Sequence, residues 1–275
     1  MQIKTLSTSR YNNSNAVNPV LVGRSQGNPA TSATQLANFG VSVDGNYFIL
    51  INSISTECYV NFSLNGGPYI LIMTTSGTGS TYGYDSTVWT DTTGGINTAL
   101  NPTSASNQVH TAFYNTSTTR TALALYQNTN SYFHYLNHSS YTARALANGV
   151  ISVPTAVTPD GTTIAGGNLI PPSSAARPGG WGAAIIGAGF SAMNWGSTFY
   201  RYGWQHGTPD PTVFGYCRFG WTADQDSSDS RDRMIGIGIK NAGGGPIGNV
   251  SYSAGYTDYA GSTSNTLRAW LYIAN

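Results

Sequence analysis

The chain has 275 residues and a formal net charge of +1, and only 8% of its residues are charged, against roughly 25% in an average soluble protein. This charge excludes a nucleic-acid-binding surface, which needs clustered Lys and Arg. The 18 Tyr, 9 Phe and 6 Trp exclude a disordered chain, because disordered chains are poor in aromatic residues.

The first 27 residues are polar and aperiodic, and we interpret them as an N-terminal arm or attachment segment before one domain of residues 28–275. They contain no apolar run of the kind found in signal peptides. The longest nearly apolar run, residues 181–190, is too short to span a bilayer. Two cysteines cannot build a disulfide framework. We therefore expect synthesis in a reducing cytosol and no membrane insertion.

One short helix is predicted after the arm. Asn28 is a favourable N-cap residue, and Pro29 then occupies the first helical position. Four apolar residues follow at helical spacing and share one face: Ala30, Ala33, Leu36 and Ala37. Gly40 can adopt the left-handed conformation that ends a helix.

Strands are predicted next. Residues 47–51 form an unbroken apolar run, which favours a strand covered on both faces. Residues 58–64 alternate apolar and polar, as in a half-buried strand. Residues 65–67, Asn-Gly-Gly, indicate a hairpin, and residues 69–73 are its return strand.

The rest of the chain predicts fewer strands. Residues 74–180 are rich in Ser, Thr, Asn, Gly and Pro, with short candidate strands at 109–114 and 121–126. Near the end, residues 235–239 alternate Ile and Gly, which predicts a strand with close backbone approach. Residues 267–273 alternate Leu, Ala and Ile with Arg, Trp and Tyr and form a closing strand. The predicted fold is α+β: mainly β with few short helices, a twisted antiparallel sheet at the start and a loop-rich second half.

The order of helix, glycine, strand and Gly-rich hairpin in residues 32–73 resembles the opening of fibrinogen C-terminal-like domains. The matching residues are Leu36, Gly40, Asp44, Gly45, Tyr47, Ile49, Cys58, Gly66 and Gly67. Residues 215–275 are similar to the second half of the bacterial and phage branch of that family. The family's helix cysteine, which bridges the counterpart of Cys58, is Ala33 here, and Pro68-Tyr69 replaces the hairpin tryptophan.

This resemblance implies a recognition module. Members of the family bind glycans, acetylated groups or protein ends, often with a calcium ion bound by a loop of the second half. The phage members resemble tail-fibre or tail-tip adhesins. The lost disulfide agrees with synthesis in a reducing cytosol.

A calcium site is predicted in residues 224–232. Asp224, Asp226 and Asp229 have the close spacing with which one loop can surround a hard cation with oxygen ligands. The segment has no Gly at the sixth position and no Glu at the twelfth, so it is not an EF-hand loop. The alternative is a solvated acidic loop that Arg231 and Arg233 neutralise.

Aromatic residues crowd the same half of the chain and predict a ligand site, because aromatic rings stack on the apolar faces of sugars and lose little side-chain entropy. The candidate residues are Tyr256, Asp258, Tyr259, Trp221 and Trp204. The alternative for each tryptophan is a place in the core, so the two tyrosines beside Asp258 are the stronger candidates.

Catalysis finds little support in the sequence. No HExxH motif surrounds His134 and His138, and strand-like spacing would place them too far apart for one metal ion. The sequence has no nucleophile elbow, phosphate-binding loop or dinucleotide fingerprint. We therefore expect that the protein is not an enzyme.

The neutral surface, the absent framework of disulfides and the resemblance together predict a phage tail-fibre or tail-tip receptor-binding protein of the virion. It would fold in the host cytoplasm, attach to other virion or tail proteins through residues 1–27, and bind a host-surface glycan. Such fibres are commonly homotrimers, so a homo-oligomer is expected. Two alternatives stay open: a structural or decoration protein of the virion without receptor binding, and a free bacterial lectin.

Overall fold

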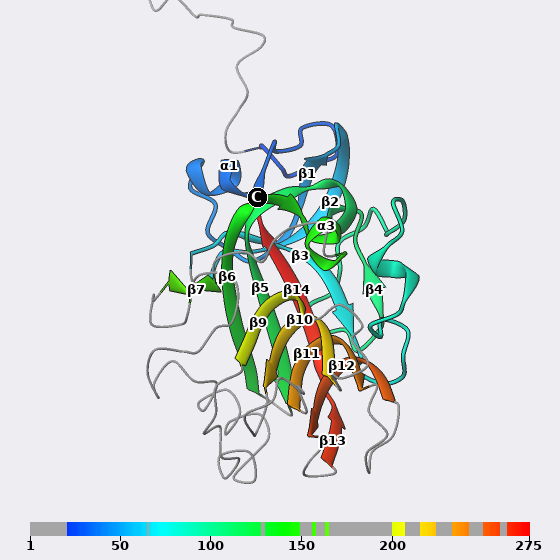
Figure 1. The fold of residues 1–275 in the computed structure, drawn as a ribbon. Helices are drawn as coiled ribbons and strands as arrows, with labels where there is room; N and C mark the ends of the chain where they lie inside the picture. The colour runs from blue at the N-terminus through cyan, green and yellow to red at the C-terminus, as the bar shows by residue number, and fades with distance from the viewer. Residues whose placement is uncertain are drawn as a thin grey trace, which may run out of the picture.

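The computed structural model of the protein describes residues 21–64, 66–127, 130–148, 156–157, 163–164, 200–206, 215–223, 233–241, 250–258 and 263–275. These residues form mainly antiparallel β-sheet with a few short helices, as predicted (Figure 1). A seven-stranded and a five-stranded sheet make up most of the described part, and a two-stranded sheet accompanies them.

The seven-stranded sheet has the order β1-β2-β3-β14-β5-β6, and β4 pairs with β3. Its strands are β1 (Gly45–Ile51), β2 (Ile54–Asn61), β3 (Tyr69–Thr75), β4 (Gln108–Val109), β5 (Ser117–Gln127), β6 (Asn130–Thr142) and β14 (Arg268–Ala274). The five-stranded sheet has the order β13-β12-β11-β10-β9. Its strands are β9 (Tyr200–His206), β10 (Gly215–Ala223), β11 (Arg233–Asn241), β12 (Val250–Asp258) and β13 (Thr263–Thr266).

The remaining elements are short. Strands β7 (Ala156–Val157) and β8 (Thr163–Ile164) pair only with each other. The helices are α1 (Ala33–Asn38), the 3-10 helix η1 (Thr87–Trp89), α2 (Ala112–Asn115) and α3 (Ala143–Ala147).

Helix α1 begins later than predicted. Its N-cap is Ser32, whose side chain accepts a hydrogen bond from the Gln35 N–H. The proposed N-cap Asn28 lies in a turn instead, because Ala30 forms a parallel bridge with Ile49 of β1 and is held in extended pairing. The predicted helix end is confirmed: Gly40 has a φ of 82°.

The predicted hairpin region is confirmed in its pairing. Strands β1 and β2 are antiparallel, and β2 then pairs with β3 across the Gly-rich turn. The run in β1 is fully buried on one face only, since Tyr47, Ile49 and Ile51 are buried and the residues between them are half-buried. In β2, Cys58 and Val60 are buried in alternation with half-buried neighbours, as expected.

Strand β14 lies in the middle of the first sheet, between β3 and β5. Residues 269–273 are all buried, so both faces of this strand are covered, and the alternation predicted for it does not mark an exposed face. On one face of β14, Leu271 and Ile273 pack in the main core. On the other face, Trp270 and Tyr272 pack in a second hydrophobic cluster.

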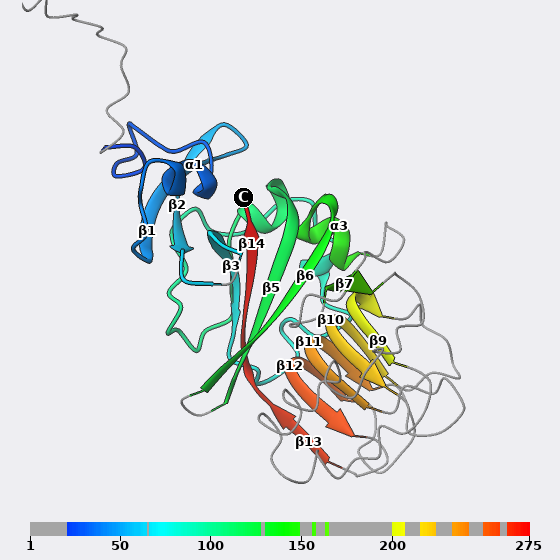
Figure 2. The same ribbon diagram turned by 90° about the vertical axis from the view of Figure 1, so that its left-hand side faces the viewer.

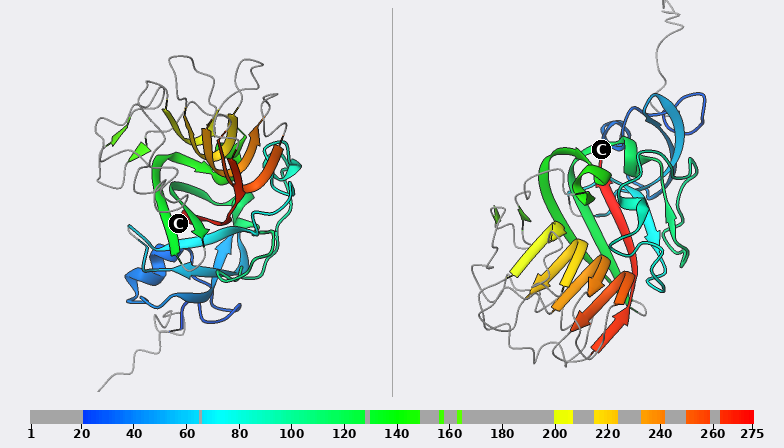
Figure 3. Two further views of the ribbon diagram at one scale, coloured as in Figure 1. Left: turned by 90° about the horizontal axis from the view of Figure 1, so that it is seen from below. Right: turned by 45° about the vertical axis from the view of Figure 1, so that its right-hand side comes forward.

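The second sheet was largely missed by the prediction of a loop-rich second half. Its described strands pair in continuous antiparallel register from β9 to β13. Phe219, Ile237 and Ala254 belong to the same core as Leu123 and Leu271 of the first sheet, so the two sheets pack face to face. Figures 2 and 3 show β9 to β12 lying along one side of β5, β6 and β14.

The close backbone approach predicted for the glycines of β11 is confirmed. A Cβ atom on Gly236 would collide with the carbonyl oxygen of Phe219 on β10. Gly238, with a φ of 60°, lies against the Arg218 side chain and the buried ring of Trp89.

Residues 21–27, which belong to the predicted arm, contact the domain. The Val22 side chain is buried in the main core. The carbonyl of Gly23 accepts a 2.8 Å hydrogen bond from the Phe48 N–H of β1, and the Arg24 guanidinium lies over the Tyr47 ring at 5.0 Å. This segment therefore covers the outer edge of the sheet at β1.

Deleting residues 1–27 should lower the free energy of unfolding by about 2 to 4 kcal/mol more than deleting residues 1–20 does. The longer deletion removes Val22 from the core and opens the β1 edge. Urea denaturation of both truncated proteins checks this prediction. Equal stability of the two would contradict it.

Candidate functional site

The register of the second sheet brings most of the predicted ligand residues to one end of it. The terminal row of backbone pairs crosses all five strands in the order Tyr200, Ala223, Arg233, Asp258 and Thr263. We call this end of the sheet the sheet-end site. In Figure 1 it lies toward the bottom, near β13, far from α1 at the top.

Two of the predicted aromatic residues lie two rows further along the strands. This row pairs Tyr202, Trp221, Ile235, Tyr256 and Asn265. One strand separates Trp221 from Tyr256, so their backbones are roughly 10 Å apart at the usual strand spacing.

Trp204, the fourth candidate among the described residues, lies nearer the middle of the sheet. Its backbone pairs with Phe219, whose side chain is fully buried. The structure therefore places Asp258 in the terminal row, Trp221 and Tyr256 in the third row, and Trp204 in the fifth.

The other candidates lie outside the described residues. Asp224, Asp226 and Asp229 belong to the connection between Ala223 and Arg233, and Tyr259 follows Asp258 directly. Both connections start and finish at the terminal row, because Ala223 pairs with Arg233 and Asp258 pairs with Thr263. Within the described ranges, no group of three or more His, Cys, Asp or Glu residues could hold a metal ion.

A buried cysteine–histidine pair has the residue types of a catalytic dyad. The Cys58 Sγ lies 3.8 Å from the His110 Nε2, and both residues are completely buried. The His110 Nδ1 accepts a hydrogen bond from the Ala112 N–H, so the proton of the neutral ring is on Nε2, which donates to the Glu57 carbonyl at 3.0 Å.

The protonation states of this pair do not suit nucleophilic catalysis. Burial raises the pKa of the Cys58 thiol far above its usual range, so the thiolate needed for attack does not form. Burial also lowers the pKa of His110 to about 4, so the ring is neutral at physiological pH. Because both side chains are shielded from solvent, the pair is a structural feature of the core.

His110 also explains why residues 109–114 are not the predicted strand. Its ring accepts the Ala112 N–H, which turns the chain after β4 and starts α2. The following residues Phe113 and Tyr114 pack edge-to-face with each other, and Phe113 does the same with Trp89.

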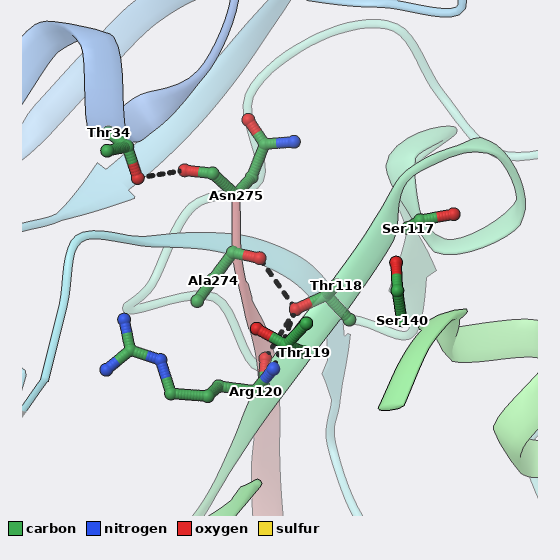
Figure 4. Close-up of a pocket in the computed structure, with 8 residues that line it drawn as sticks. All are labelled: Thr34, Ser117, Thr118, Thr119, Arg120, Ser140, Ala274 and Asn275. Atoms are coloured by element: carbon green, nitrogen blue, oxygen red, sulfur yellow. Dashed lines mark hydrogen bonds between the residues drawn. The ribbon is translucent and has the colours of Figure 1, made fainter. Parts of the chain in front are cut away.

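A polar pocket at the other end of the fold was not predicted. Its volume is about 240 Å³, and it is lined by Thr34, Ser117, Thr118, Thr119, Arg120, Ser140, Ala274 and Asn275 (Figure 4). The run Ser117-Thr118-Thr119-Arg120 was a visible signal in the sequence, but the pocket needs three further segments that only the tertiary fold brings beside it.

Comparison of the chain with protein-family models and with curated proteins found no match. Among the described residues, no helix has the length and apolar character needed to cross a bilayer.

Proposed function

We propose that the chain is a receptor-binding protein of a phage tail fibre or tail tip, with a fibrinogen-like domain that recognises a host-surface glycan at the sheet-end site. The observation that supports this proposal is the register of β9 to β13. It brings Trp221 of β10 to the same end of one sheet as Tyr256 and Asp258 of β12.

These residue types suit a sugar ligand. Aromatic rings supply large, rigid contact areas for the apolar faces of sugar rings. A carboxylate accepts hydrogen bonds from sugar hydroxyls. The charge-poor composition of the chain suits a neutral ligand better than a polyanion.

The proposal includes a calcium ion bound by Asp224, Asp226 and Asp229. Their segment leaves the sheet at Ala223 and returns at Arg233, beside Asp258. A cation there would sit next to the sugar-binding aromatic residues and would order their loop. The competing arrangement, in which Arg231 and Arg233 neutralise the acidic segment, predicts no response to calcium.

The proposal also assigns the chain to the virion, attached through its first residues to other tail proteins as a homo-oligomer, commonly a trimer. Purified protein should then block phage adsorption to the host, because it occupies the receptor. A structural or decoration protein of the virion would leave adsorption unchanged.

Replacing Tyr256 or Tyr259 by Ala should weaken glycan binding by about tenfold or more, with little change in melting temperature. A glycan array first identifies the ligand, with and without Ca²⁺, and titration of the variants with that glycan gives their affinities. Tyr59→Ala, on β2 of the first sheet, is the control for loss of a tyrosine ring elsewhere in the protein.

Two outcomes would contradict the proposal. One is an array without any bound glycan under either condition. The other is an affinity that falls equally in Tyr59→Ala and in the sheet-end variants. Unchanged binding and melting temperature after removal of Ca²⁺ would overturn the calcium site alone.

A further inference from the structure

The polar pocket lies at the opposite end of the molecule from the sheet-end site. It is built where β14 ends, between the start of β5, the end of β6 and helix α1. Figure 1 shows this end beside the mark for the C-terminus, next to α1. The pocket shares no residue with the sheet-end site.

An irregularity in the β5–β6 pairing shapes the pocket. Thr118 pairs with Tyr141, but Arg120 pairs with Asn137, so β6 has more residues than β5 between the two pairs. Such a bulge bends both strands and leaves backbone groups without their ladder partners. The Thr118 hydroxyl lies 2.6 Å from the carbonyls of Arg120 and Ala274, so it replaces part of the missing pairing.

Helix α1 is fixed against the same place. The Asn275 carbonyl accepts hydrogen bonds from the Thr34 N–H at 2.9 Å and from the Thr34 hydroxyl at 2.7 Å. The Ala33 N–H donates to the Asn275 side-chain oxygen at 3.2 Å. These bonds connect helix α1 to the end of β14, a central strand of the sheet.

The remaining polar groups of the lining are available to a ligand. The hydroxyls of Ser117, Thr119 and Ser140 make no hydrogen bond with the described residues, and all three residues are exposed. Figure 4 shows Ser117 and Ser140 on one side of Thr118 and the Arg120 guanidinium on the other.

Arg120 is positioned without an ion pair. Its guanidinium lies over the Tyr69 ring at 5.6 Å, and no described residue forms a salt bridge with it. Gly66 leaves room for it, because a Cβ atom there would come within 2.5 Å of an Arg120 terminal nitrogen. A planar, fixed guanidinium can donate two parallel hydrogen bonds to a neighbouring pair of oxygen atoms.

We propose that this pocket binds one neutral monosaccharide unit, as a second sugar site. Hydroxyl groups of Ser117, Thr119 and Ser140 both donate and accept, as sugar hydroxyls do, and Arg120 donates to two adjacent sugar oxygens. The volume of about 240 Å³ is below the range of drug-sized pockets, so it suits a single ring better than a longer saccharide. Binding at this pocket does not require a ligand at the sheet-end site.

The full chain should be titrated by NMR with the methyl glycosides of glucose, galactose and mannose, and separately with inorganic sulfate. At least one glycoside should bind with saturable shifts. The double variant Ser117→Ala/Ser140→Ala and the single variant Arg120→Gln should each weaken that binding by about fivefold or more. The Thr118 bonds involve only the backbone of Arg120, so the fold should be retained.

Two control variants test whether binding is specific to this pocket. Arg268→Gln removes another arginine stacked on a tyrosine of the same sheet, at 5.9 Å from the Tyr126 ring, and should leave glycoside binding unchanged. The loss caused by Ser117→Ala/Ser140→Ala should persist in a Tyr256→Ala background, which distinguishes this pocket from the sheet-end site. Absence of glycoside binding, binding of sulfate alone, or equal losses in the pocket and control variants would overturn the proposal.

Discussion

Replacing Arg218 by Met should lower the free energy of unfolding by about 3 to 5 kcal/mol. Arg218 lies on β10 and is only 7% exposed. Its Nε donates to the Tyr84 carbonyl at 2.7 Å, a terminal nitrogen donates to the Ala147 carbonyl at 2.8 Å, and the guanidinium lies 4.2 Å from the centre of the Tyr84 ring. One side chain thus joins the second sheet to α3 and to the segment that follows β3.

Methionine fills much of the same space but donates no hydrogen bond, so both carbonyls would lose a donor inside the protein. Arg218→Lys should recover only part of the loss, because an ammonium group cannot reproduce the planar arrangement of donors. Urea denaturation measures these differences, and Arg268→Met is the control, since Arg268 is exposed. A loss below about 1 kcal/mol for Arg218→Met would contradict this role of Arg218.

Lowering the pH from 7 to 5 should destabilise the protein by about 2 kcal/mol through His110. Burial lowers the pKa of His110 from 6.5 to about 4. Between these values the unfolded chain binds a proton at this residue and the folded chain does not, so stability rises with pH in this window. The contribution is fully present above pH 6.5 and is lost as the pH falls toward 4.

The difference between wild type and His110→Asn isolates this effect from the other titrating groups. Asparagine can still accept the Ala112 N–H, but it does not titrate. The variant should be less stable at pH 7, because the Glu57 carbonyl loses its donor. Its free energy of unfolding should then depend less on pH. Parallel pH profiles of the two proteins, measured by urea denaturation, would show that His110 does not carry the effect.

The parts of the fold that could be predicted are those with local signals. The turn glycines and the alternation of Cys58 and Val60 predict the pairing of β2 with β3, and the Ile-Gly alternation predicts β11. Strand β6 gives no such signal, because its sequence is rich in Asn, Ser and His, and it forms through pairing with β5. The start of α1 was misplaced for a similar reason, since Ala30 is fixed by a distant strand.

The candidate site was also predictable only as far as local sequence signals reach. Residue types alone pointed to Trp221, Tyr256 and Asp258, but only the register of five strands shows that they share one end of a sheet. The polar pocket could not be predicted, because Thr34, Ser140 and Asn275 are brought together by the order of strands in the first sheet.

The position of β14 also determines when the first sheet can be completed during translation. β3 and β5 do not pair with each other, because residues 268–274 lie between them. While the ribosome synthesises the second sheet, both strands therefore retain an open edge flanked by apolar residues. Such edges associate readily with other chains, so a nascent copy is most exposed to aggregation in this interval. Completion of the central strand removes both open edges in one step.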